Sequence, residues 1–280
     1  MPKRLAPRLL RIFGVLALLV VAGLGWGYWT AVSEPAVRRT ELRIAGLQAP
    51  LRLVLFSDIH VEAPDMPPER LARIVAQVNA LKPDLVLIAG DFISEKYAGT
   101  HLYSMAAAIA PLAGLKARLG TVAVLGNHDH WNDAPGARAA LADAGIRLLS
   151  NQAAAIGPLA VGGLDDDFTH RADLPATLDA LRALPGPRIM LSHSPDPFAD
   201  LPADVPLMLA GHTHCGQVAL PFLGAVRTMS RYGKRYACGI VREGGKVLIV
   251  GAGLGTSGLP LRLGAVPDLW LVTLRPAGAR

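Results

Sequence analysis

Short apolar segments alternate with amphipathic segments through the part of the chain that follows residue 50. Continuous apolar runs cover residues 51–57, 85–89 and 121–125, as expected for β-strands that are covered on both faces. Between them, residues 68–81 place apolar side chains on one face of a helix, and residues 102–113 predict a second helix. This order predicts a βαβ series, in which polar loops gather at the carboxyl ends of the strands.

The apolar runs of the second half are shorter and less regularly separated by helices. Strands are predicted at residues 153–156, 159–161, 188–192, 207–210, 236–241, 246–250 and 269–274. Two sheets that face each other, with helices outside, would account for this many strands. The sequence does not fix the order of the strands within the sheets.

The N-terminal region has a different pattern, an unbroken apolar stretch at residues 12–32. At about 1.5 Å per residue, a helix of this length spans a bilayer core. Basic residues precede the stretch, and Trp26, Tyr28 and Trp29 lie near its far end. We therefore predict that residues 1–34 are a single-pass membrane anchor that exports the rest of the chain; a cleaved signal peptide and a buried core helix are the alternatives. Residues 35–50 are expected to be a linker with a first short strand at 41–44.

Composition and charge limit the class of protein. The chain has 280 residues, of which 51% are hydrophobic and 18% charged, and its mean hydropathy is +0.35, which excludes a disordered or coiled-coil chain. Much of the net charge of +6 flanks the apolar stretch, so no dedicated nucleic-acid surface is predicted. Arg38, Arg39 and Arg43 follow that stretch and weaken the charge asymmetry that favours export. Cys215 and Cys238 allow at most one disulfide, so the cysteine count does not decide which cellular compartment the protein occupies.

Nine side chains able to bind metal or transfer protons follow the predicted strands. They are Asp58, His60, Asp91, Asn127, His128, Asp129, His193, His212 and His214. Each alone has an ordinary explanation, such as a helix cap or a turn, but together they include four histidine-bearing clusters at strand ends. Imidazole and carboxylate groups without thiolates are typical ligands of a hydrolytic transition-metal site. Their number allows two ions, which together can activate water and bind a phosphoryl oxygen.

The motifs SDIH, GD, GNHD, SH and GHTH, in this order, resemble those of the calcineurin-like metallophosphoesterase superfamily. The resemblance implies an α/β fold, a four-layer αββα sandwich over residues 51–280, with a centre of two divalent ions, manganese or alternatively iron or zinc. It implies that Asp58, His60 and His214 hold the first ion and that Asn127, His193 and His212 hold the second. Asp91 would bridge them. His128 would protonate the leaving group, and Asp129 would orient the His128 ring.

A narrower resemblance follows from the anchor, GHTHCGQ and GLGTSGLPLR. Together they look like a bacterial membrane-associated phosphodiesterase branch, some of whose members cleave the pyrophosphate of UDP-diacylglucosamine. The implied function is hydrolysis of a phosphodiester or pyrophosphate of a lipid or nucleotide-lipid at the bacterial inner membrane, with the catalytic domain on the outer face. Alternatives are a phosphomonoesterase, protein phosphatase or nuclease of the same superfamily, and a catalytically silent metal-binding scaffold.

A few other residues receive weaker assignments. His130 is a candidate substrate contact, with Trp131 either beside it at the mouth of the site or covering the core. Arg262 is a candidate phosphate or structural contact. Cys215, where that branch usually has glycine, is interpreted as a small packed residue rather than a ligand. The acidic run at residues 165–167 is interpreted as a solvated turn.

Overall fold

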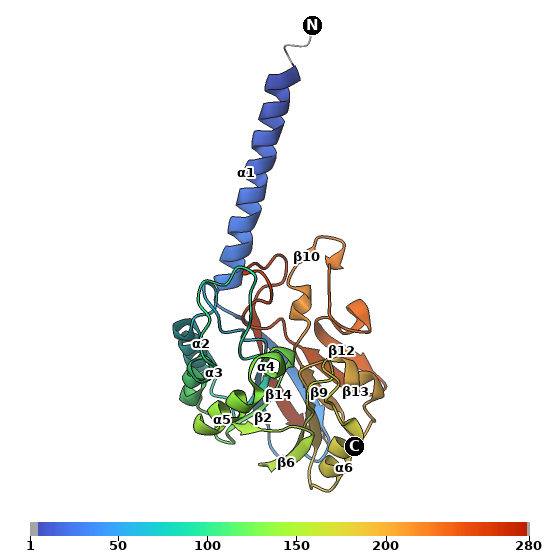
Figure 1. Ribbon diagram of the computed structural model, residues 1–280. Coiled ribbons are helices and arrows are strands. Elements are labelled where there is room, and N and C mark those ends of the chain that lie inside the picture. Colours follow the sequence, from blue (N-terminus) through green and yellow to red (C-terminus); the bar gives the residue numbers. More distant parts are fainter. Residues whose placement is uncertain (1–4, 279–280) are drawn as a thin grey trace.

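The structure is a computed structural model that describes residues 5–278, and the side chains of residues 9–278. Lys3 and Arg4, on which part of the N-terminal charge argument rests, lie outside the described residues. Two six-stranded sheets form the centre of the part that follows the N-terminal helix, and that helix, α1 (Leu5–Val32), projects away from it (Figure 1).

The first sheet has the strand order β1-β14-β2-β3-β4-β5. Its strands are β1 (Ala36–Ile44), β14 (Asp268–Pro276), β2 (Leu51–Phe56), β3 (Leu85–Ala89), β4 (Thr121–Val124) and β5 (Arg147–Leu148). β2, β3, β4 and β5 run parallel to one another. β14 is antiparallel to β2 and parallel to β1, with Trp270 opposite Leu55 and Ala36 opposite Asp268. The amino end of β1 therefore lies at the edge of the sheet where β2, β3 and β4 end.

The second sheet has the order β12-β13-β9-β8-β7-β6. Its strands are β12 (Gly239–Glu243), β13 (Lys246–Val250), β9 (Leu207–Ala210), β8 (Arg188–Leu191), β7 (Leu159–Gly163) and β6 (Gln152–Ile156). The inner four are parallel, and both edge strands pair antiparallel with their neighbours. A separate hairpin is formed by β10 (Ala219–Leu220) and β11 (Gly224–Ala225).

Three apolar layers hold the sheets and helices together. The central layer joins side chains such as Leu53 and Leu87 of the first sheet to Leu191 and Leu209 of the second. The outer face of the first sheet is covered by α2 (Pro68–Ala80), α3 (Met105–Ile109), η1 (Ala110–Gly114) and α5 (Ala134–Asp143). The outer face of the second is covered by α6 (Leu174–Arg182) and η2 (Asp196–Asp200). The predicted αββα arrangement is confirmed.

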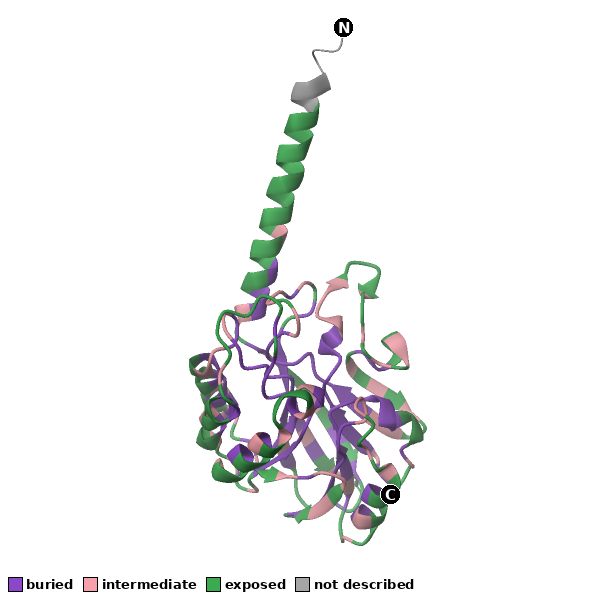
Figure 2. Ribbon diagram, in the orientation of Figure 1, coloured by how far each residue is buried: buried purple, intermediate pink, exposed green. Residues whose placement is uncertain are grey.

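Helix α1 is apolar and exposed along most of its length (Figure 2). Residues Leu9–Val32 are long and apolar enough to span a membrane, and an 18-residue apolar part of this stretch contains no buried residue. Among the residues whose side chains are described, the last turns of α1 contact the rest of the protein. The Arg262 backbone N–H donates to the Gly27 carbonyl (2.9 Å), and Arg70 donates to the carbonyl of Ser33, which directly follows the helix (2.8 Å). These contacts argue against a buried core helix.

Several elements differ from the sequence prediction. The expected linker and short strand are one nine-residue strand, β1, paired along its whole length with β14. The helix expected at 102–113 is two short pieces, α3 and η1, because Pro111 interrupts it. Helices α5 and α6 were not predicted. Each begins with an aspartate N-cap, Asp133 in α5 and Asp173 in α6, and a proline follows two residues later. This combination is a signal for a helix start, so both helices could have been predicted from the sequence.

Candidate metal centre

The seven candidate ligands converge from both sheets onto one site. Each follows the carboxyl end of a strand: Asp58 and His60 follow β2, Asp91 follows β3, Asn127 follows β4 at the start of α4 (Asn127–Asn132), His193 follows β8, and His212 and His214 follow β9. All seven are at least 94% buried. The prediction that the polar clusters meet at one edge is confirmed for these residues.

The backbone of the site is held in unusual conformations. Asp58, His60, Asp91, His212 and His214 all have positive φ, between 49° and 70°. Such left-handed residues cost about 1–3 kcal/mol each when they are not glycine, and they collect at functional sites because the surrounding fold imposes them. Five of them among seven candidate ligands show that this edge of the sheets is built to aim side chains inward.

Glycines permit the close approach of these loops. At Gly126 an added Cβ would lie 2.2 Å from Asp91 Oδ1. At Gly253, where φ is +76°, an added Cβ would lie 2.5 Å from the Asp58 Cβ. No other residue type fits either position without moving a candidate ligand.

The first group of donors is Asp58, His60 and His214. His60 Nε2 lies 3.0 Å from His214 Nε2, and His214 Nε2 lies 3.4 Å from Asp58 Oδ1. The other ring nitrogen of His60 faces the Ile93 carbonyl at 3.2 Å. A carbonyl at Nδ1 selects the tautomer whose Nε2 lone pair is free to bind a cation.

The second group is Asn127, His193 and His212. His193 Nε2 lies 3.1 Å from Asn127 Oδ1 and 3.1 Å from His212 Nδ1. His193 Nδ1 faces the Ala89 carbonyl at 2.6 Å, which again leaves Nε2 directed into the site. Asp91 lies between the groups, its Oδ2 3.5 Å from His60 Nε2 and 3.3 Å from His193 Nε2.

The donors fit divalent ions in type and in spacing. Ligands about 2.1 Å from a shared ion lie on the order of 3.0 to 3.4 Å from one another, and the distances within both groups are in this range. His60 Nε2 and His214 Nε2 face each other at 3.0 Å, a spacing at which both nitrogens could bind one ion. Three sets of potential ligand atoms cluster here: Asp58 with His60 and His214, Asp58 with Asp91 and His193, and His60 with Asp91 and His128.

Burial sets the protonation of most of these imidazoles. It lowers the pKa of His60 and His214 well below the ordinary value and lowers the pKa of His212 to about 3. These rings are therefore neutral near pH 7, the form that binds metal. Burial also raises the pKa of Asp58 to about 6, because a carboxylate without a cation is unfavourable there.

His128 lies at the edge of the centre. Its backbone N–H donates to Asp91 Oδ1 (2.9 Å), and its ring centroid is 4.8 Å from that of His60. Its Nε2 lies 3.4 Å from the Ser257 hydroxyl. The ring of Trp131, which is 57% exposed, packs edge-on against His128 at 5.0 Å. Trp131 thus lies at the mouth of the site and does not cover the core.

Asp129 does not orient His128, contrary to expectation. Its carboxylate is buried and accepts hydrogen bonds from the backbone N–H groups of Asp91 (2.9 Å), Phe92 (2.8 Å) and Gly126 (2.9 Å). Both oxygens are used in this way. Asp129 therefore fastens the loop after β3 to the loop after β4, and so fixes the position of Asp91.

His130 also differs from its assignment as a substrate contact. Its Nε2 lies 2.7 Å from Asp165 Oδ1, and its side chain is only 5% exposed. The acidic run is likewise not a solvated turn: Asp165 and Asp166 are buried, and Asp167 pairs with Arg231 at 2.9 Å. Burial alone would raise the pKa of Asp165, but hydrogen bonds from His130 and Ser150 outweigh it and hold that pKa at about 2.

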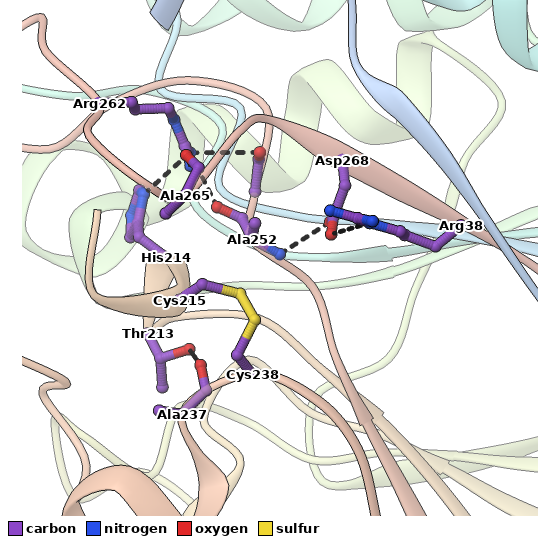
Figure 3. The surroundings of a disulfide bond; sticks show 11 residues. Arg38, Thr213, His214, Cys215, Ala237, Cys238, Ala252, Arg262, Ala265 and Asp268 are labelled. Atoms are coloured by element: carbon purple, nitrogen blue, oxygen red, sulfur yellow. Dashed lines mark hydrogen bonds and ion pairs between the residues drawn. A yellow bond between two sulfur atoms is a disulfide. The ribbon is translucent and has the colours of Figure 1, made fainter. Parts of the chain in front are cut away.

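Arg262 is a structural contact and cannot meet phosphate, because it is fully buried. Its guanidinium donates to the carbonyls of Ala252 (2.8 Å), Gly255 and Ala265, and its Nη2 lies 3.3 Å from His214 Nδ1 (Figure 3). Arg262 thereby packs the loop after β13 around the ring of His214.

Cys215 is buried and packs with Ala252 and Ala265, as interpreted, and it also forms a disulfide with Cys238 (Figure 3). The bond joins the residue after His214 to the start of β12. A second link lies beside it, where the Thr213 hydroxyl donates to the Ala237 carbonyl at 2.6 Å. The pairing was one possibility allowed by two cysteines, but no local pattern identified it.

Comparison with known proteins agrees with this geometry. The sequence profile of the family described as calcineurin-like phosphoesterase matches residues 51–216. Uncharacterized metallophosphoesterase YkuE of Bacillus subtilis is 33% identical over 94% of this chain and 95% of its own length. An uncharacterized metallophosphoesterase of Aquifex aeolicus is 30% identical over 89% of this chain and 91% of its own. A zebrafish (Danio rerio) relative named transmembrane protein with metallophosphoesterase domain is 31% identical over 94% of this chain and 63% of its own.

Proposed function

This chain belongs to the calcineurin-like phosphoesterase family and is a metal-dependent phosphoesterase, and we propose that it cleaves a phosphodiester or pyrophosphate bond of a lipid-linked substrate at a membrane surface. We assign one divalent ion to Asp58, His60 and His214, a second to Asn127, His193 and His212, and a bridging role to Asp91. Manganese is the proposed metal, with iron or zinc as alternatives that the same donors would accept.

Two divalent ions supply charge neutralisation at the phosphoryl oxygens and lower the pKa of water when bound. The chain's own contribution begins with positioning. The backbone N–H of His128 and the carboxylate of Asp129 hold Asp91 from two sides. The reacting group of the substrate is thereby presented to fixed donors, which saves reorganisation during the reaction.

We assign proton transfer to His128. Its ring is partly exposed beside the buried centre, lies near the Ser257 hydroxyl and packs against the rings of His60 and Trp131. Imidazole is the side chain that exchanges protons near neutral pH, and a donor at the rim can reach the oxygen that leaves. The Asp91 contact at the His128 backbone keeps the ring at that rim.

One observation carries the proposal of a lipid-linked substrate. Helix α1 ends at Val32, four residues before β1 begins at the edge where β2, β3 and β4 deliver Asp58, Asp91 and Asn127. If α1 spans a bilayer, that edge faces the membrane and the opposite edge faces away from it. A phosphate in the head-group layer is then closer to the site than one bound to a soluble macromolecule.

The disulfide supports an exported catalytic part. Cys215 and Cys238 are paired, and such bonds persist on the oxidising side of a membrane rather than in the cytosol. The basic N-terminus favours the same orientation. Two reporters fused to the C-terminus test this orientation. One that works only outside the cytoplasm should give a signal, and one that works only in the cytoplasm should give none; the reverse result would overturn this orientation.

The experiment that tests the substrate proposal compares two aryl esters with the same leaving group. Bis-p-nitrophenyl phosphate is soluble, and dioleoyl phosphatidyl-p-nitrophenol is held in the bilayer. The full chain, reconstituted with manganese in lipid nanodiscs, should turn over the lipid diester with the higher kcat/KM, because attachment raises the local concentration. A p-nitrophenyl monoester and UDP-diacylglucosamine complete the panel. Preference for the soluble diester or for the monoester would refute the proposal.

A further inference from the structure

The hairpin β10–β11 presents a set of apolar side chains to solvent. Residues 220–226 read LPFLGAV, and we call them the hairpin tip. Phe222 is fully exposed, and Leu220, Leu223 and Val226 are 42%, 65% and 64% exposed. Isolated exposed apolar residues are common on proteins, but a contiguous set marks a surface that is covered by something else.

The hairpin tip lies at the same end of the molecule as α1 (Figure 1). Val218, at the base of the hairpin, bridges to Leu263 and Gly264. Leu261 and Leu263 lie over Gly27 of α1, within 3.5 Å of the position of an added Cβ. One short segment therefore ties the hairpin to the last turns of the apolar helix.

Neighbouring loops at this end also carry exposed apolar side chains. Tyr97 is 92% exposed and Leu259 is 49% exposed. The two loops are joined, since the Tyr97 N–H donates to the Gly258 carbonyl at 2.9 Å. The Tyr28 hydroxyl of α1 lies 3.4 Å from the Pro64 carbonyl, beside the same loops. The apolar surface thus extends around the base of α1.

Basic residues border the hairpin tip. No aspartate or glutamate occurs between residues 219 and 242. Lys234 donates to the Leu223 carbonyl, and within the described part of the chain Arg227 forms no ion pair. An apolar tip with adjacent cations is complementary to an anionic bilayer surface, where the tip enters the acyl boundary and the cations meet phosphates.

We propose that the hairpin tip inserts into the leaflet adjoining the base of α1, with anionic phospholipid as its partner. This inference rests on the proposed membrane function, and it gives the catalytic part a second attachment point beside the helix. An isolated two-stranded hairpin is marginal in water. Here the Cys215–Cys238 disulfide closes the segment that contains it, and the bilayer covers its tip.

The attachment orients the metal centre toward the lipid. The hairpin segment leaves the site three residues after His214, at Gln217, and returns at Met229, whose carbonyl lies 3.2 Å from His212 Nε2. Phe222 is eight residues beyond His214, so the centre lies at most about 28 Å from the tip. A phosphoester in the head-group layer, with its acyl chains in the membrane, would be the substrate class presented in this way.

The test is the depth of the hairpin tip in nanodiscs that contain phosphatidylglycerol. The full chain carrying Phe222→Cys is labelled with the polarity-sensitive fluorophore NBD in the absence of reductant, because both native cysteines are paired. The matched control is Gln152→Cys, an exposed position on β6 at the far end of the domain (Figure 1). Leu223→Cys serves as the second tip position.

The proposal expects both tip labels to shift to shorter emission wavelength on reconstitution and to be quenched by nitroxide-labelled acyl chains, while the label at 152 does neither. The proposal would be overturned if, in nanodiscs that contain α1, the tip labels had the same emission wavelength and quenching as the label at 152. Hydrolysis of bis-p-nitrophenyl phosphate, measured on the same samples, separates the two proposals. An inserted tip without metal-dependent hydrolysis would contradict the proposed function alone.

Discussion

Replacement of Asp129 by asparagine should destabilise the protein and weaken metal binding together. Its carboxylate accepts three buried backbone N–H groups, two at Oδ2 and one at Oδ1. An asparagine has a single acceptor oxygen. In its better orientation that oxygen keeps the Asp91 and Gly126 donors, while its NH₂ group faces the N–H of Phe92.

The magnitude follows from that mismatch. Loss of one hydrogen bond to a charged acceptor costs about 1.5–3 kcal/mol, and a buried unsatisfied N–H costs about 1–3 kcal/mol. Because these terms overlap, we expect a loss of about 3 kcal/mol in the free energy of unfolding. For a domain of this size that lowers Tm by roughly 6–12 °C.

Thermal unfolding in detergent, with metal content measured on the same samples, checks the prediction. Asp133→Asn is the matched control, because Asp133 caps α5 near the surface and asparagine caps equally well. If Asp129→Asn kept its Tm and its metal but lost activity toward substrates with poor leaving groups, Asp129 would orient His128 after all, and the role assigned to it here would be wrong.

Three further outcomes are expected. His128→Asn should leave metal content unchanged and slow hydrolysis by about 10²–10⁴-fold for poor leaving groups; equal slowing of all aryl esters, or loss of metal, would instead make it a ligand. Reduction of the Cys215 disulfide should lower the free energy of unfolding by about 3 kcal/mol, since its cysteines are 23 residues apart; unfolding curves that coincide with and without reductant would contradict this. Because the pKa of Asp165 is held at about 2, below the unfolded value, its contribution to stability is complete above about pH 4 and is lost as the pH falls toward 2. His130→Asn should weaken this acid dependence, and an unchanged acid profile would show that the pair does not contribute.

Much of the fold was predictable because its central strands are buried on both faces. The strands expected at residues 85–89, 207–210 and 246–250 match β3, β9 and β13. The edge strand β1 was mostly missed, since its sequence AVRRTELRI has four charged residues among nine and resembles a polar linker. Its partner β14 lies more than 200 residues away, and only tertiary pairing turns the segment into a strand.

The candidate ligands could be found from sequence because metal-binding side chains must follow strand ends, where folding brings them together. The roles of residues that depend on one particular contact could not be predicted from the sequence. Asp129 directly follows His128, as a partner in proton transfer would. Only the positions of three backbone N–H groups show that its carboxylate joins two loops instead. Likewise, the His130 ring pairs with Asp165, 35 residues along the chain. The Arg262 guanidinium donates to carbonyls that no spacing rule predicts.

Metal stoichiometry measured together with hydrolysis tests the central claim most directly. The full chain is stripped with chelator and titrated with manganese, and bound metal and the rate on bis-p-nitrophenyl phosphate are followed in wild type, Asp91→Asn and the exposed-carboxylate control Asp179→Asn. The account predicts two ions per chain and activity that rises with the second in wild type and control, and loss of both in Asp91→Asn. Full turnover by metal-free protein, or an Asp91→Asn variant that keeps two ions and the wild-type rate, would contradict it.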